Sequence, residues 1–140
     1  MRVTQIIDSL NYGGAQKLLV SLADAMRQHP EVSLRVISLR EDPGVAIIDE
    51  IRAQGVEVDT IPSAARHNLH DFRRFSRLLR RLRQTKTQVI HSHLQYGNIL
   101  GTLAGRLLGI PVVASLHNEA YDSRNESHRR HKIETRVLGW

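Results

Sequence analysis

The sequence predicts an α/β fold: a doubly wound parallel sheet with helices on both of its faces. Short apolar strands alternate with amphipathic helices along the whole chain, and most of these strands are apolar on both faces, which is typical of parallel sheets buried between helices. Right-handed crossovers between successive strands make such a sheet doubly wound. A chain of 140 residues can build one domain of this kind with its own core, but not two.

The first half of the chain supplies two strands and two helices. A buried strand is expected at Val3–Ile7, where branched apolar residues cluster. A helix is expected over Ala15–Arg27, where leucines recur at helical spacing until Pro30 ends it. A second strand at Leu34–Leu39 leads to a helix over Asp42–Gln54, which begins with a capping aspartate and a proline.

The second half continues the alternation of strand and helix. Its expected elements are a strand at Val56–Ile61, a basic helix over residues 69–86, a strand at Gln88–His91, a helix at Gly97–Leu108, a strand at Val112–Leu116 and a helical stretch ending at Trp140. Parallel sheets bind ligands beyond the carboxyl ends of their strands, near the point where the strand order reverses. This rule selects three loops: Ser9–Gly14, His91–Gly97 and His117–Tyr121.

Composition excludes several classes of protein. The chain has no cysteine, so disulfide frameworks and thiolate chemistry are excluded. We see neither a signal peptide at the N-terminus nor an apolar run that approaches the ~20 residues of a membrane span. A cytoplasmic location is therefore expected.

The first of the selected loops contains Gly13 and Gly14, between a strand and the start of a helix. Glycines let a ligand approach the backbone, and the free amides of the helix start favour an anion such as a phosphate. The alternative is that the two glycines only make a tight turn. The pattern is neither G-x-G-x-x-G nor a P-loop, so a nicotinamide dehydrogenase is disfavoured.

Histidines occupy the ends of the fourth and fifth strands. His91 and His93 project to the same side of one strand, and His117 directly follows the next. No firm third ligand accompanies the H-x-H pair, so we expect hydrogen bonding near a cleft and no metal. His117 and the adjacent Asn118 lie where the sheet meets its ligand, and histidine there can bind a phosphate or a sugar hydroxyl. The alternative for His117 is a loop histidine bonded to the backbone.

The basic helix concentrates the charge of the chain. Residues 67–86 carry seven basic side chains and one acid, so this segment accounts for the whole net charge of +6. Five arginines form one arc of the helix opposite its leucines: Arg73, Arg74, Arg77, Arg80 and Arg81. The arc is either merely solvated or meets anionic lipid headgroups or a phosphorylated acceptor. Few aromatic residues and no known motif argue against nucleic acid.

Three segments together resemble a known family. They are Asp8-Ser9-Leu10-Asn11-Tyr12-Gly13-Gly14-Ala15-Gln16, Val89-Ile90-His91-Ser92-His93, and Gly109-Ile110-Pro111-Val112-Val113-Ala114-Ser115-Leu116-His117-Asn118. Their order and spacing resemble the N-terminal, Rossmann-like domain of family 4 retaining glycosyltransferases with the GT-B fold.

The resemblance implies the roles of the matching residues. Asn11, Gly13 and Gly14 lie in the loop that contacts the donor diphosphate and the acceptor, and His117 contacts the donor sugar and matters for catalysis. His91, His93 and Asn118 line the cleft. The implied substrates are a nucleotide sugar and a sugar or lipid-linked acceptor, such as a cell-envelope glycan. No cofactor and no metal are implied.

The resemblance also implies a mechanism and a location. Transfer proceeds on the front face of the donor with retention at the anomeric carbon, without a covalent carboxylate nucleophile. Some members dock on membranes through a basic helix of this domain, which favours the inner face of the membrane for the arginine arc.

The family pattern is incomplete in one respect. The donor-binding arginine, lysine and glutamate pair belong to a C-terminal domain, which we expect to be missing from residues 1–140, so this part alone should be inactive. Glu126 and Glu134 have the spacing of that pair without its context, and we regard them as coincidence. Two other hypotheses remain: a stand-alone module that binds anionic lipid or nucleic acid, and a dinucleotide oxidoreductase.

Overall fold

The fold is known from a computed structural model, which describes residues 1–11, 13–40, 45–61 and 72–117. In these ranges strands and helices alternate as expected. The strands are β1 (Arg2–Ile7), β2 (Ser33–Ser38), β3 (Glu57–Thr60), β4 (Val89–His93) and β5 (Val112–Ser115). The helices are α1 (Gly14–Met26), α2 (Ala46–Ala53), α3 (Phe72–Gln84) and α4 (Leu94–Leu108).

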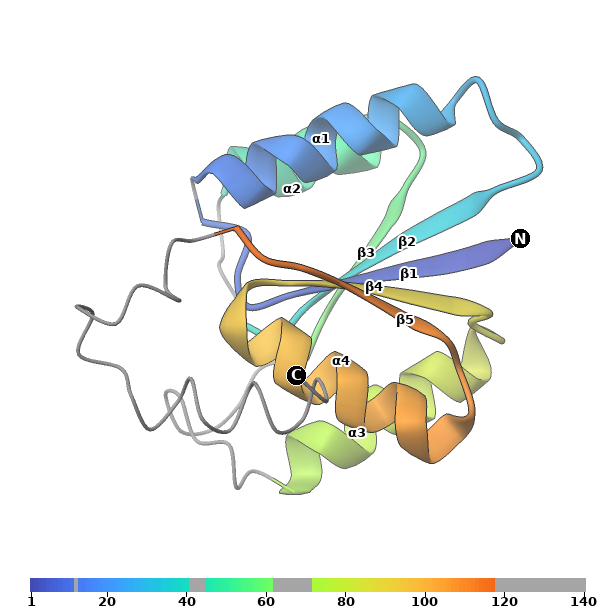
Figure 1. The fold of residues 1–140 in the computed structure, drawn as a ribbon. Helices are drawn as coiled ribbons and strands as arrows, with labels where there is room; N and C mark the ends of the chain where they lie inside the picture. The colour runs from blue at the N-terminus through green and yellow to red at the C-terminus, as the bar shows by residue number, and fades with distance from the viewer. Residues whose placement is uncertain (12, 41–44, 62–71, 118–140) are drawn as a thin grey trace.

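The five strands form one parallel sheet in the order β3-β2-β1-β4-β5. The order reverses between β1 and β4, which is the switch point of a doubly wound sheet. Figure 1 shows α1 and α2 on one face of the sheet and α3 and α4 on the other. The predicted fold class, a Rossmann-like parallel sheet with helices on both faces, is confirmed.

Each face of the sheet has its own apolar core. On one face, β1 and β2 contribute Ile6 and Ile37, which pack with Leu78 of α3 and Leu100 of α4. On the other face the core is built by α1, α2 and the alternate strand residues: Ile7, Leu10, Ala15, Leu19, Ala23, Val36, Ile47, Ile51, Val56 and Val58. Because successive strand residues point to opposite faces, this assignment also determines on which face each remaining side chain of β1 lies.

α4 lies unusually close to the sheet because glycines line its inner face. A Cβ at Gly97 would lie 2.9 Å from the Ile6 carbonyl oxygen, and one at Gly101 would lie 2.9 Å from Cβ of Ser92. At Gly105 the nearest atom is Cγ2 of Val112, at 2.1 Å. Any larger residue at these positions would push the helix away from the strands. This glycine stripe, formed by Gly97, Gly101 and Gly105, sets the distance between α4 and the sheet.

The junction between β4 and α4 differs from the prediction. We expected the strand to end at His91 and the helix to begin at Gly97, with a loop between them. Instead the strand continues to His93 and the helix begins at Leu94. The reversal occurs at Leu94, which has a φ of 63°, a left-handed conformation that is costly for a non-glycine residue. The polar residues Asn98 and Thr102, which are part of α4's buried side, do not interrupt the helix.

Some expectations lie outside the described residues. These are the aspartate and proline that begin the second helix, the first turn of the basic helix at 69–71, Asn118 with the rest of its loop, and the last helical stretch with Glu126, Glu134 and Trp140. In the described part of the chain, no helix is both long and apolar enough to span a bilayer.

Candidate functional site

The site is organised by the carboxyl rim of the sheet, where three neighbouring strands end. In the ladder, Ile7 of β1 pairs with His93 of β4, and His93 pairs with Ser115 of β5. The chain turns into α1 just beyond the first of these residues, and His117 lies just beyond the last. Gly13, Gly14 and His117 therefore lie along one rim, at the left of the sheet in Figure 1. His117 is partly buried and is not sealed into the core.

The glycine pair is not explained by a tight turn alone. Gly13 is extended, with a φ of −179°, and Gly14 is also outside the left-handed region that favours glycine. A Cβ at Gly14 would meet nothing within 4 Å, so the protein itself leaves this position open. At Gly13 a Cβ would collide with the side chain of Gln16, whose Nε2 donates to the Ser9 carbonyl. The open space over Gly14 suits close approach of a ligand to the helix start.

A chain of hydrogen bonds links His117 to the interior of the sheet. Nε2 of His117 lies 2.8 Å from Nδ1 of His93, and Nε2 of His93 lies 2.6 Å from Oε1 of Gln5. The two histidine rings are stacked, with centroids 5.1 Å apart. His93 has no exposed surface, so its ring reaches the rim only through His117.

His91 joins the same cluster one register position further from the rim. Its Nε2 lies 2.8 Å from the Oγ of Ser115, and its ring centroid is 4.2 Å from that of His93. The prediction that His91 and His93 point to the same side is confirmed. His91 is partly buried, whereas His93 has no exposed surface and can act on a ligand only through its neighbours.

Burial keeps the two inner histidines uncharged. Desolvation, with smaller contributions from His91 and His117, lowers the pKa of His93 to about 3. Desolvation and then His117 also lower the pKa of His91. The inner pair therefore acts as neutral hydrogen-bonding groups at physiological pH.

All of these groups share the α1 face of the sheet. Ile7 belongs to the core under α1 and α2, and Gln5 lies two residues earlier in the same strand, on the same face. Since Gln5 contacts His93, and His93 contacts His117, the histidine chain is on this face as well. The glycine pair at the start of α1 and the histidine chain therefore lie on the same face and at the same rim of the sheet.

Asp8 holds the neighbouring helix start at the rim. Its two carboxylate oxygens accept hydrogen bonds from the backbone N–H groups of Tyr96 and Gly97, at 3.2 and 2.5 Å. A carboxylate at this end of α4 also interacts favourably with the positive end of the helix dipole. The start of α4 is thereby occupied by the protein, in contrast to the start of α1, where Gly13 provides no side-chain cap.

Of the two other loop residues predicted for the site, one is exposed and the other lies outside the described residues. Asn11 is exposed, in the loop between β1 and α1, on the side of the glycine pair. Asn118 lies outside the described residues. Among the described residues, no group of three histidine, aspartate or glutamate side chains is arranged to hold a metal ion.

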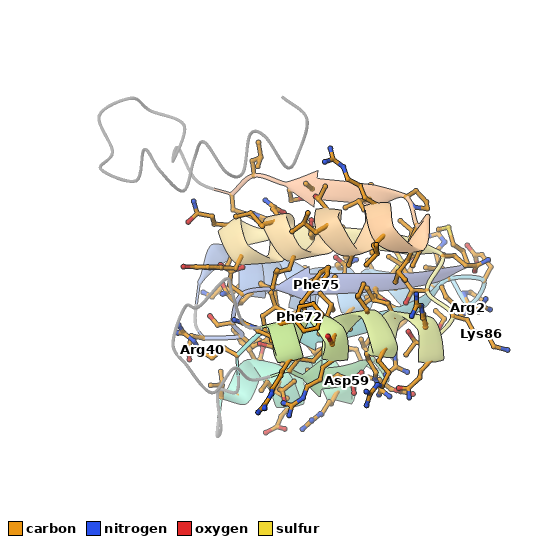
Figure 2. All side chains as sticks on the ribbon, turned by 90° about the horizontal axis from the view of Figure 1, so that it is seen from below. Arg2, Arg40, Asp59, Phe72, Phe75 and Lys86 are labelled. Atoms are coloured by element: carbon orange, nitrogen blue, oxygen red, sulfur yellow. The ribbon has the colours of Figure 1, made fainter. Side chains whose placement is uncertain are left out.

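The predicted arginine arc is wrong for two of its five members. Arg74 is 8% exposed and its guanidinium donates to the Leu39 carbonyl at the end of β2. Arg81 makes a two-pronged ion pair with Asp59, with N–O distances of 2.7 and 2.6 Å. Both arginines are therefore part of the contact between α3 and the sheet, which Figure 2 shows with Asp59 lying beside α3.

The sequence could not show this because the partners come from other elements. Arg81 reaches β3, where Asp59 also binds Arg35 of β2 at 2.9 Å. Burial alone would raise the pKa of Asp59, but the two arginines outweigh it and lower that pKa. An aspartate in an edge strand and an arginine in a helix are not linked by any spacing in the sequence.

The rest of the arc is exposed as expected. Arg73, Arg77 and Arg80 are exposed, and within the described ranges none of them makes an ion pair. Phe72, at the start of α3, is 78% exposed. The start of α3 thus exposes an aromatic ring beside arginines that make no ion pair with other described residues, and this side of the helix is not packed against the sheet.

Sequence reasoning missed Gln5, which completes the histidine chain. The available signal was a glutamine in the middle of an otherwise buried strand, Val3–Ile7. A buried polar side chain needs a hydrogen-bond partner, and here the partner is His93, 88 positions along the chain.

One pocket of about 360 Å³ lies on the same face of the sheet but away from the rim. Gln5 and His91 line one side of it, and Met1, Leu22 and Met26 line others. Neither Gly14 nor His117 lines this pocket, so it is not the place where a ligand would contact them.

Comparison with known proteins identifies the family. A family model described as Glycosyltransferase Family 4 matches residues 12–140. A relative from Campylobacter jejuni subsp. jejuni serotype O:2 is 31% identical over 122 residues, which are 86% of this chain and 34% of that protein. It is named GalNAc-alpha-(1->4)-GalNAc-alpha-(1->3)-diNAcBac-PP-undecaprenol alpha-1,4-N-acetyl-D-galactosaminyltransferase. The chain spans about a third of the length of this curated relative.

Solved structures show the same fold in proteins of different activity. Anabaena Alr3699/HepE in complex with UDP has a TM-score of 0.77 at 14% identity, over 99% of this chain and 35% of that one. The UDP-GlcNAc 2-epimerase from Methanocaldococcus jannaschii has a TM-score of 0.62 at 10% identity, over 98% and 37%. Likeness of fold at this identity does not distinguish transfer from epimerisation. The match to the family model does, and the chain belongs to glycosyltransferase family 4.

Proposed function

We propose that this chain is the N-terminal, acceptor-side domain of a retaining glycosyltransferase. The enzyme transfers a sugar from a nucleotide-sugar donor to a lipid-linked or cell-envelope glycan. Family membership supports sugar transfer, and the geometry of the rim supports the location of the reaction.

The observation that carries the proposal is the shared rim of Gly14 and His117. The space over Gly14 is open, so a diphosphate can reach the amides at the start of α1. His117 lies at the end of the same rim, on the same face, and is held by His93 at 2.8 Å. A donor whose diphosphate lies over the glycines would place its sugar toward His117.

The chemistry required of this domain is positioning rather than covalent catalysis. In front-face transfer with retention, the diphosphate separates as the acceptor approaches on the same side, and the sugar becomes cation-like. Amides at the helix start stabilise the growing negative charge of the diphosphate, and His117 orients the sugar. The nucleotide sugar is a substrate, and neither a metal nor another cofactor is part of the proposal.

A lipid-linked acceptor is supported by the relative and by α3. The name of the Campylobacter jejuni relative specifies an acceptor linked through PP to undecaprenol. Exposed Arg73, Arg77 and Arg80 provide a cationic surface that suits either a diphosphate or anionic headgroups. We place the enzyme at the inner face of the membrane on this basis.

The proposal assigns donor binding chiefly to a second domain. Residues 1–140 correspond to about a third of the curated relative, and the groups that hold the nucleotide would lie in the other part. The isolated chain should accordingly bind nucleotide sugar weakly and transfer none of it.

His117→Ala in the full-length protein tests the proposed site. We expect turnover with the nucleotide-sugar donor to fall about 100-fold or more, because an oriented polar contact to the reacting sugar is lost. The free energy of unfolding, measured in urea, should fall by no more than the loss of one hydrogen bond, about 0.5–1.5 kcal/mol, because His117 is at the rim and its removal lets water reach His93. His29, an exposed histidine between α1 and β2 that pairs with Glu31, provides the control His29→Ala. Near-normal turnover of His117→Ala would remove His117 from the site.

A second function, docking on an anionic membrane, is favoured by one observation. Phe72 is 78% exposed next to arginines that have no ion-pair partner in the described part of the chain. An apolar ring beside cationic side chains is the combination that binds the headgroup region of a bilayer.

Flotation with vesicles tests this docking. The triple variant Arg73→Gln, Arg77→Gln, Arg80→Gln should lose binding to vesicles rich in anionic lipid. It should remain folded, because none of the three makes an ion pair with another described residue. The matched control Lys17→Gln, Arg27→Gln, Arg52→Gln removes the same charge from α1 and α2, on the other face, and should still float. If both variants lose vesicle binding equally, the binding depends on net charge and not on α3. If the parent protein does not bind these vesicles at low salt, docking is excluded.

A further inference from the structure

We propose that His93 is a positioning residue for His117, and that the chain Gln5–His93–His117 determines which ring nitrogen His117 offers to the substrate. The part that concerns catalysis rests on the proposed function of His117. The hydrogen-bond chain itself does not, so the two can fail separately.

The first link fixes the proton on the buried ring. Gln5 is 2% exposed, and its Oε1 lies 2.6 Å from Nε2 of His93. An amide oxygen accepts hydrogen bonds and cannot donate one. Nε2 of His93 therefore carries a hydrogen.

The second link follows because the ring stays uncharged. His93 is fully buried, and the titratable groups whose charges act on it are His91 and His117. A neutral imidazole carries one N–H, so Nδ1 of His93 has only a lone pair. The depressed pKa of His93 agrees with this state.

The third link orients the residue at the rim. Nδ1 of His93 and Nε2 of His117 are 2.8 Å apart, and since the former can only accept, His117 must donate from Nε2. In its uncharged form His117 then presents Nδ1 as an acceptor. Such a nitrogen recognises a hydroxyl group, the donor that a sugar offers, rather than a phosphate oxygen.

Because Gln5 and His93 are buried, both must keep their hydrogen-bond partners. Gln5 and His93 are each removed from water, and each would be left with an unsatisfied polar atom if its partner were lost. A buried glutamine and histidine whose hydrogen bonds end at a partly exposed histidine are arranged to hold that outer ring in one orientation.

The hydrogen bond is tested by NMR on the chain labelled with ¹⁵N. We expect a scalar coupling across the hydrogen bond between Nε2 of His117 and Nδ1 of His93, with the proton bonded to His117. We also expect a slowly exchanging proton on Nε2 of His93. Absence of the coupling, or a proton on Nδ1 of His93, overturns the inference whatever the function of the protein.

Two variants of similar size separate positioning from packing in the full-length protein. His93→Asn keeps an acceptor oxygen near the place of Nδ1, whereas His93→Gln can reach Gln5 but offers no acceptor at that place. We expect His93→Gln to lower kcat roughly 10- to 100-fold and His93→Asn to lower it much less.

The same substitutions in a His117→Ala background complete the test. If His93 acts through His117, His93→Gln should lower kcat no further once His117 is gone. An equal loss in both backgrounds overturns positioning and leaves a structural role. If His117→Ala alone leaves kcat unchanged while the NMR coupling is present, the proposed function of His117 fails and the hydrogen bond stands.

Discussion

His93 shows why single residues at the rim have unequal roles. Sequence spacing groups it with His91 and His117, yet it is the one ring with no exposed surface. Its neighbours in space are Gln5 and His117, which are separated from it by 88 and 24 positions. Spacing in the sequence could predict that these histidines reach one rim, because strand ends in a parallel sheet converge. It could not predict which ring is buried, since that depends on the face covered by α1.

The buried histidine predicts a pH dependence of stability. Its pKa is about 3 in the folded protein against 6.5 for the unfolded chain, so the unfolded state binds the extra proton as the pH falls. The free energy of unfolding contributed by His93 is therefore complete above pH 6.5 and decreases as the pH drops toward 3. The expected slope is about 1.4 kcal/mol per pH unit.

Urea unfolding at pH 6 and pH 4, between the two pKa values, measures this slope. His93→Gln should reduce the slope by the amount given above, while the contribution of His91, whose pKa is also lowered, remains. A slope that is the same in His93→Gln and the parent protein would contradict the burial of an uncharged His93.

At the scale of elements, the order and type of the strands and helices were predictable, but their contacts were not. Apolar periodicity and the positions of Gly55, Gly109 and Pro30 were sufficient to place strands and helices. The predicted boundaries of β4 and α4 were wrong because the chain reverses sharply at Leu94. No sequence rule would choose a leucine for a left-handed conformation. The arginine arc was wrong at Arg74 because the end of β2 supplies its carbonyl partner.

The glycine stripe of α4 gives the sharpest prediction at this scale. A Cβ at Gly97 would lie 2.9 Å from the Ile6 carbonyl oxygen and 3.3 Å from Oδ1 of Asp8. Gly97→Ala should therefore shift the start of α4, weaken its bonds to Asp8 and lower the free energy of unfolding by about 1–3 kcal/mol.

Gly14→Ala is the matched control, because its Cβ would meet nothing within 4 Å. Its midpoint of urea unfolding should stay close to that of the parent protein or rise slightly, since alanine favours helix. If the donor approaches this position, the same variant loses activity in the full-length enzyme. Equal destabilisation by both substitutions would show that the space around the two glycines is alike, contrary to the structure.

For the molecule as a whole, the sheet brings together groups that the sequence separates by a hundred positions. Gly14 and His117 lie along the same rim because β1 and β5 flank β4 and all three strands run in the same direction. This part of the site was predictable from the rule that parallel sheets bind ligands at the carboxyl ends of their strands. The match to the family model shows that the chain belongs to glycosyltransferase family 4, and the same fold in an epimerase shows why the fold alone would not have been enough.

The most direct test of the account is a crystal structure of the full-length protein with a non-transferable nucleotide-sugar analogue. We expect the diphosphate within hydrogen-bond distance of the amides at the start of α1, over Gly14. We expect a sugar hydroxyl within the same reach of Nδ1 of His117. A donor bound without contact to either residue would contradict the account.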